Sequence, residues 1–176
     1  MKTIGLKFSA VLLSIATAAL AGSTAASSAQ ISFDKLKVLA GEWEGVVTTV
    51  PPEPSVQGKT AQVTLRVTSL GNAFMHEMKI PGRPDDPITM LYLDAGRLLL
   101  THYCDAGNRP RMAGVQSPDG QSIDFDLLDV AGDTTYGHMQ KAAFHFIDAD
   151  HHSEEWTFHV EGKGHVLAHF ELSRKK

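Results

Sequence analysis

The chain has 176 residues, with 16 basic and 20 acidic side chains, a formal charge of −4 and a single cysteine, Cys104. An acidic balance predicts no surface for nucleic acid or anionic lipid, because both ligands attract clustered Lys and Arg side chains. One cysteine cannot form an internal disulfide, so a chain of this length must be held together by its core.

Residues 1–29 are expected to be a signal peptide. Lys2 and Lys7 precede an apolar run that ends near Ala21, and small residues without an acid follow it. Cleavage is expected after Ala21 or after Ala29, since both end a small-x-small triplet. The apolar run is shorter than the ~20 residues that span a bilayer. We therefore expect an exported protein, periplasmic or secreted, with no stable membrane insertion and one domain at 30–176.

A short helix is expected at 32–40, just before the first strand. Ser32 can cap it, the side chains of Phe33, Leu36 and Leu39 share one side, and Gly41 ends it. Such a helix would cover one end of a β-structure.

Almost every later segment alternates with period two. Residues 61–68 place Ala, Val, Leu and Val on one face and polar residues on the other, as in a half-buried antiparallel strand. Turn-forming residues separate about ten such segments, near 43–50, 61–69, 72–80, 88–94, 97–104, 110–116, 121–129, 138–147, 152–160 and 165–174. Short connections predict an all-β, antiparallel up-and-down barrel of about ten strands with a short N-terminal helix. Charged side chains on the second face argue against an outer-membrane barrel, which is apolar outside.

The sequence Gly41-Glu42-Trp43 at the first strand and Arg174 at the end of the last strand resemble the structural signature of lipocalins and other calycins. The resemblance implies that Arg174 stacks on Trp43 and closes the barrel, a structural role. Ten strands are more similar to the nitrobindin and fatty-acid-binding branches, although Pro51, Pro52 and Pro54 exclude the helical pair of the latter. A nitrobindin resemblance implies a haem held by a histidine, but no position here matches that ligand motif. The chain also resembles uncharacterised secreted bacterial lipocalin-like proteins.

Polar residues gather at the end of the predicted barrel away from the helix, where the loops 51–60, 81–87, 105–110, 130–137 and 161–164 meet. Alternation places His102, Cys104 and His138 on inward faces near this mouth. His76 is expected deeper, beside Tyr92. The predicted ligand contacts are His76, Tyr92, His102, Cys104, Asn108, Arg109, Arg111, Tyr136 and His138.

Structural roles are the alternative for each of these residues. Asn108 and the arginines can cap turns and neutralise acids such as Asp105, and each histidine can be a satisfied core residue. Histidine, cysteine and carboxylate groups are also zinc ligands, but no local motif names a metal site, and none is assigned. In 148–154, a turn with solvated histidines is favoured, and an inward His152-x-Glu154 pair stays open.

The leading hypothesis is an exported binding protein for a small apolar or aromatic ligand, with or without an acidic group held by arginine. An enzyme with His102 or His138 as general acid or base and Arg111 as anion holder is the alternative. A haem- or metal-binding barrel and a filled structural barrel also remain. The sequence carries no nucleophile elbow, phosphate loop or dinucleotide fingerprint and names no cofactor or oligomeric state.

Overall fold

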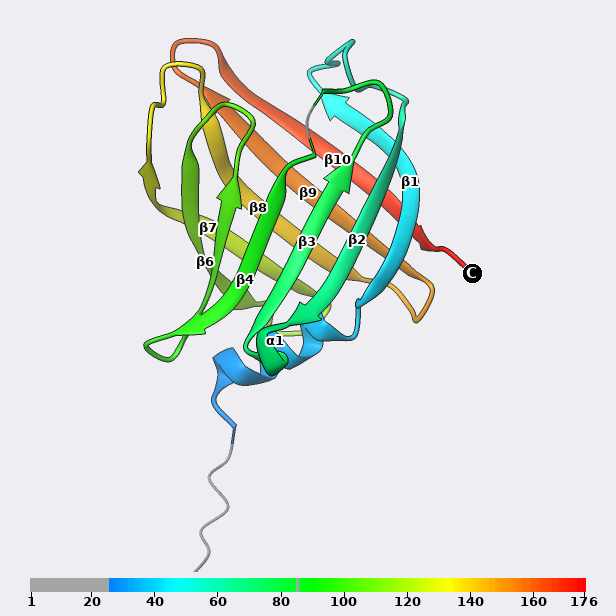
Figure 1. The fold of residues 1–176 in the computed structure, drawn as a ribbon, viewed down its shortest axis with the longest axis vertical. Coiled ribbons are helices and arrows are strands. Elements are labelled where there is room, and N and C mark those ends of the chain that lie inside the picture. Colours follow the sequence, from blue (N-terminus) through cyan, green and yellow to red (C-terminus); the bar gives the residue numbers. More distant parts are fainter. Residues whose placement is uncertain (1–25, 85) are drawn as a thin grey trace, which may run out of the picture.

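The computed structural model describes residues 26–84 and 86–176, which form a closed antiparallel β-barrel (Figure 1). Most of the expected signal peptide, residues 1–25, lies outside the described residues. The strands are β1 (Gly41–Val50), β2 (Thr60–Thr68), β3 (Ala73–Lys79), β4 (Ile88–Asp94), β5 (Arg97–Tyr103), β6 (Arg109–Gln116), β7 (Ser122–Ala131), β8 (His138–Phe146), β9 (His151–Val160) and β10 (Gly164–Arg174).

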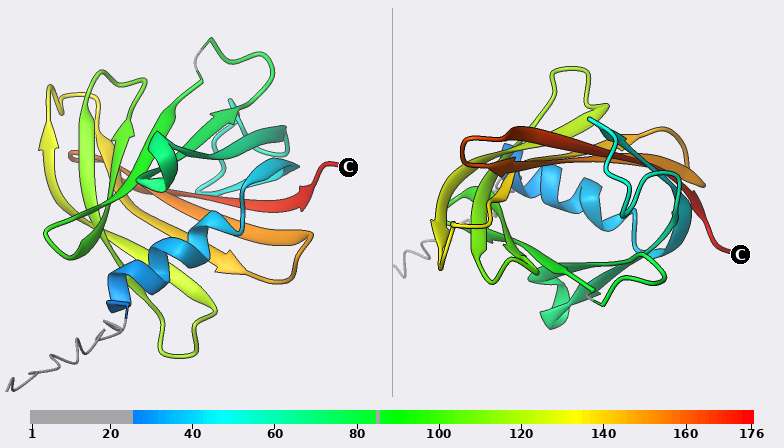
Figure 2. Two further views of the ribbon diagram at one scale, coloured as in Figure 1. Left: turned by 60° about the horizontal axis from the view of Figure 1, so that its bottom comes forward. Right: turned by 90° about the horizontal axis from the view of Figure 1, so that it is seen from above.

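The strand order is the order of the sequence. Each strand pairs with the next, and β10 pairs with β1 to complete the ring that Figure 2 shows from above. Antiparallel neighbours need only short turns, such as the one between β4 and β5, and closure leaves no unpaired edge. The predicted ten-stranded up-and-down barrel with a short N-terminal helix is confirmed.

One face of each strand fills the interior. In β2, Ala61, Val63 and Leu65 are buried while Gln62 and Arg66 are exposed, which is the alternation that the sequence predicts. Large side chains from both halves of the barrel meet in this core. They include Trp43, Phe74, Phe125, Phe144 and Phe170.

The helix α1 (Ser28–Lys37) covers one end of the barrel (Figure 2). It begins one turn earlier than expected, because Ser27 is the N-cap and its side chain accepts a hydrogen bond from the backbone N–H of Gln30. The expected cap, Ser32, is instead buried inside the helix, where its hydroxyl donates to the carbonyl of Ser28 at 2.9 Å. A short 3-10 turn, η1 (Ser69–Gly71), lies at the same end.

Apolar side chains on the inner side of α1, and Leu39 two residues after its end, face the barrel, as their spacing predicts. Phe33, Leu36 and Leu39 are buried against the barrel core. Within 26–84 and 86–176, no helix has the length and apolar character needed to span a bilayer.

Trp43 and Arg174 close the barrel at the helix end. They lie directly opposite each other in the β1–β10 register, and the guanidinium carbon is 4.1 Å from the centre of the indole ring. Trp43 Nε1 donates to the carbonyl of Leu39 at 2.8 Å, and Arg174 Nη1 donates to the carbonyl of Ala40 at 2.8 Å. Gly41 has a φ of +146°, which L side chains rarely adopt, and a Cβ there would lie 2.4 Å from Arg174 Nη1, so glycine is favoured at this position. The pair joins the first strand, the last strand and the end of the helix.

A β-bulge interrupts the alternation of β8. The register shifts between Met139 and Lys141, so Gln140 is an extra residue without a partner on β9. Met139 pairs with Phe158 and faces the interior, whereas His138 pairs with His159 on the outer face. Counting alternate residues back from Phe144 therefore gives the wrong face for His138.

Candidate functional site

The end of the barrel opposite α1 holds a cavity of about 140 Å³, which we call the mouth cavity. An engineered apolar cavity of about 150 Å³ binds benzene, so this volume fits a compact molecule. Among residues 26–84 and 86–176, its polar lining consists of His102, Arg83 and Asp105. Its apolar lining consists of Val47, Val56, Met78, Ile80, Pro87, Met139, Ala168 and Phe170.

His102 is the imidazole of the mouth cavity. It lies near the end of β5 on the inner face and is 5% exposed. Thr89 lies opposite it on β4, and the Thr89 hydroxyl and His102 Nδ1 are 2.8 Å apart. Because Thr89 engages Nδ1, Nε2 is the ring nitrogen through which His102 can meet a molecule in the cavity. Burial, followed by repulsion from the charge of His76, lowers the pKa of His102 to about 4, so the ring is neutral at pH 7.

A buried carboxylate lies deeper in the barrel. Glu154 is fully buried, with Oε2 2.9 Å from His76 Nε2 and Oε1 3.1 Å from His152 Nε2. Trp156 Nε1 donates to Glu154 Oε2 at 3.0 Å. Burial alone would raise the pKa of Glu154, but the charge of His76 and the hydrogen bonds from His152 and His76 outweigh it and hold the pKa well below its usual range.

Trp156 links this cluster to the mouth cavity. Its ring centre lies 5.4 Å from that of His76 and 5.4 Å from that of His102. The charged cluster and the neutral imidazole of the cavity therefore share one aromatic wall.

An ion pair stands at the rim. Arg83 Nη2 donates to Asp105 Oδ2 at 2.7 Å, and both side chains line the cavity. The half-buried Cys104 lies next to this pair, with Sγ donating to Asp105 Oδ1 at 3.5 Å. The rim thus carries a compensated charge.

His76 and His102 face the interior, where the sequence places them. His76 does not lie beside Tyr92, however, because its partner across the β3–β4 pair is Thr89. The connection 80–87 is longer than a tight turn, so it does not fix the register that a plain hairpin would have.

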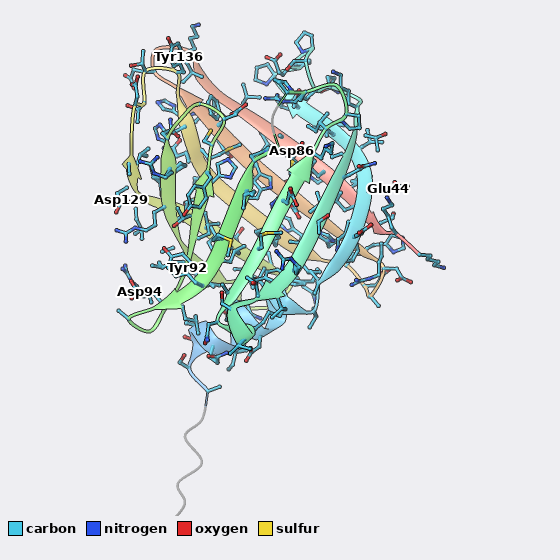
Figure 3. All side chains as sticks on the ribbon, viewed as in Figure 1. Glu44, Asp86, Tyr92, Asp94, Asp129 and Tyr136 are labelled. Atoms are coloured by element: carbon cyan, nitrogen blue, oxygen red, sulfur yellow. The ribbon has the colours of Figure 1, made fainter. Side chains whose placement is uncertain are left out.

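Tyr92 and Arg111 lie outside the barrel, contrary to the sequence prediction. The Tyr92 hydroxyl is 3.0 Å from Thr101 Oγ1, and Arg111 pairs with Asp129 at 2.5 Å on the same outer face. Figure 3 shows Tyr92 on the lower part of β4, towards the end that α1 covers. Arg111 therefore cannot hold an anion in the cavity. The alternative enzyme hypothesis assigned this role to Arg111 and is left without its anion-holding residue.

Three further predicted contacts do not reach the cavity. Arg109 and Tyr136 are exposed, and Figure 3 shows Tyr136 at the top of the loop that precedes β8. Asn108 is buried but structural, because Nδ2 donates to the carbonyls of Asp133 and Gly137, both at 2.8 Å. The amide ties two mouth loops together.

His138 also lies outside, as a consequence of the bulge at Gln140. Its ring centre is 5.7 Å from that of His159, and burial, reinforced by the charge of His159, lowers its pKa, with Glu161 acting in the opposite direction. The prediction that His138 lies inside the barrel with His76 and His102 is therefore wrong.

The inward His152–Glu154 pair that the sequence left open is present, whereas Trp156, Arg83 and Met139 were not predicted as site residues. The shared parity of His152, Glu154 and Trp156 was a usable signal, since all three lie on the inner face of β9. The prediction that His151 and His152 are both solvated is wrong for His152, which is fully buried, and is confirmed for His151, which is exposed.

No three His, Cys, Asp or Glu side chains converge on one point as metal ligands within the described part of the chain. The haem that the nitrobindin resemblance implies does not fit the mouth cavity. At about 140 Å³ the cavity is smaller than the roughly 300–1,000 Å³ of pockets for drug-sized ligands, and a haem is at least as large as those ligands.

Comparison with known proteins supports the fold alone. No family model matches the chain, and no curated protein is similar to it in sequence. A DUF3598-family protein of unknown function from Nostoc punctiforme PCC 73102 superposes with a TM-score of 0.54 at 13% identity, covering 80% of this chain. The match spans 49% of that protein, about half its length. Rv2717c from M. tuberculosis superposes with a TM-score of 0.53 at 16% identity, covering 82% of this chain and 98% of its own.

Proposed function

We propose that this protein is a calycin-like barrel that binds a compact, largely apolar molecule about the size of one aromatic ring. The observation that carries the proposal is the apolar mouth cavity with the neutral imidazole of His102 in its wall. The apolar wall provides the free energy of burial, and His102 Nε2 provides one directional hydrogen bond.

The positions of the arginines narrow the ligand class. Arg111 pairs with Asp129 on the outer face, and Arg83 pairs with Asp105 at the rim. An anionic group on the ligand would have to compete with these carboxylates. We therefore favour a neutral ligand with one hydroxyl, amine or carbonyl group over the acidic ligand that the sequence suggested.

A thermal-shift titration with phenol, indole and benzoate tests this proposal. Phenol and indole should raise the Tm of the wild-type protein in a saturable way, and benzoate should have a smaller effect. Ala168→Leu places a larger side chain in the cavity wall and should remove the response. Ala131→Leu, the same change at an exposed position of β7, should keep it. A response that survives Ala168→Leu unchanged would place the binding site elsewhere.

We also propose that the protein is exported and that the signal peptide is cleaved after Ala21. Cleavage after Ala29 would remove the cap Ser27 and the first residues of α1, whereas cleavage after Ala21 keeps them. N-terminal sequencing of the protein recovered from the exported fraction should begin at Gly22. A chain that begins at Gln30, or that is recovered only with residues 1–21 attached, would contradict this.

A further inference from the structure

Histidine is concentrated on the outer side of β8, β9 and β10. Six of the nine histidines lie there: His138, His145, His151, His159, His165 and His169. Most of them face carboxylates, as His145 and His169 face Glu155. Three of them form a separate group on the strands beside the 161–163 turn. That turn lies at the mouth end of the barrel (Figure 1).

This group is a row across three strands, which we call the histidine row. His159 on β9 lies directly opposite His138 on β8 and directly opposite His165 on β10. The ring centre of His159 is 5.7 Å from that of His138 and 4.7 Å from that of His165. Direct partners in an antiparallel pair have Cβ atoms about 4.5–5.5 Å apart, so the backbone itself holds the three rings side by side.

The far nitrogens of two of these rings are already engaged. His165 Nε2 is 2.6 Å from Gln140 Oε1, and His159 Nε2 is 3.4 Å from Glu161 Oε2. Amide and carboxylate oxygens accept hydrogen bonds, so Nε2 carries the proton in both rings and the lone pair is on Nδ1. A metal-ligating histidine has the same arrangement, with its other N–H donated to an oxygen of the protein.

Two of the Nδ1 atoms in the histidine row, those of His138 and His159, are buried and have no hydrogen-bond partner among the described residues. Buried polar atoms are normally paired, so two such nitrogens in neighbouring rings need an explanation. A cation that accepts their lone pairs provides one.

We propose that His138, His159 and His165 bind a divalent transition-metal ion of the zinc, copper or nickel type through their Nδ1 atoms. Imidazole suits these ions better than it suits calcium or magnesium. The rings do not yet converge on one point, so binding requires at least one of them to rotate. His165 is exposed and is the ring best placed to do so. The site is separate from the mouth cavity, so its test does not depend on whether the cavity binds a small molecule.

Isothermal titration of the tag-free chain with Zn²⁺ tests the site. The wild-type protein should bind close to one ion per chain. His159→Gln removes the central ligand and should weaken binding by roughly tenfold or more, and His165→Gln should weaken it while disturbing the fold least. His151→Gln, on the same strand but paired with Asp148, is the matched control and should bind as the wild type does.

Three results would overturn the proposal. The first is a wild-type chain that takes up no Zn²⁺, and the second is a His159→Gln chain that is folded and binds as tightly as the wild type. The third is equal weakening by His151→Gln and His165→Gln, which would indicate diffuse binding over the histidine-rich face.

Discussion

The two ends of this barrel differ in how their side chains are engaged. At the helix end, Trp43 and Arg174 are engaged with each other and with the carbonyls that follow α1, and apolar side chains fill the interior. At the mouth end, His102 lines a cavity with one ring nitrogen engaged by Thr89. We therefore assign stability to the helix end and place the proposed ligand at the mouth. Substitutions at the two ends should therefore affect different measurements.

The largest effect is expected from Trp43→Ala at the closed end. It removes a fully buried indole, its hydrogen bond to Leu39 and the stacking surface of Arg174. The free energy of unfolding, measured in urea, should fall by about 3–5 kcal/mol. Leu70→Ala, at a fully exposed leucine, is the control and should change it little. A Trp43→Ala protein with wild-type stability would refute the closure mechanism.

The next largest effect concerns pH and arises at the mouth. The pKa of His102 is lowered to about 4 in the folded state, so between pH 4 and 6.5 the unfolded chain holds a proton that the folded chain does not. The stability from neutral His102 is complete above pH 6.5 and is lost as the pH falls towards 4, by about 3 kcal/mol.

Urea unfolding at several pH values measures this dependence. His102→Gln should flatten the curve between pH 4.5 and 6.5, while His151→Gln, an exposed histidine, should leave it steep. The low pKa of Glu154 acts only below its ordinary value of 4.5, where stability falls again as the carboxylate is protonated. Equal slopes in the wild type and His102→Gln would contradict the assignment.

A smaller effect is expected from Asn108→Ala, which frees the two mouth loops from each other. Loss of the hydrogen bonds to Asp133 and Gly137 leaves two carbonyls without their donor and should cost about 1–3 kcal/mol. Amide hydrogen exchange should increase in 132–137 and stay unchanged in α1. Faster exchange in α1 as well would mean that the two ends are not independent.

The smallest effect is expected from Arg111→Ala. Its ion pair with Asp129 is exposed on the outer face, where solvent screens it, so the free energy of unfolding should stay close to that of the wild type. The Tm shift with phenol should equal that of the wild type. A lost shift would return Arg111 to the mouth, where the sequence argument had placed it.

The sequence predicted the barrel well because its strands are regular. Alternation located ten segments and the inward face of His102, and the parity of Arg174 with Phe170 and Leu172 predicted its contact with Trp43. These predictions depend only on period two and on short connections.

The sequence failed where regularity is interrupted. One extra residue, Gln140, puts His138 on the opposite face from the one that alternation predicts. Because the connection 80–87 is longer than a tight turn, His76 pairs with Thr89 and not with the predicted Tyr92. The helix α1 begins earlier than predicted because Ser27, and not Ser32, is its N-cap. The cluster around Glu154 brings together β3 and β9, whose contact only the closed barrel creates.

The most direct test of a binding mouth is the NMR spectrum of methionine methyl groups during a titration with phenol. Met78 and Met139 line the cavity, whereas Met75 and Met90 pair with each other on the outer face. If the mouth binds phenol, Met78 and Met139 should show saturable shifts, with no change at Met75 and Met90. Shifts at all four methyl groups, or at none, would contradict this proposal.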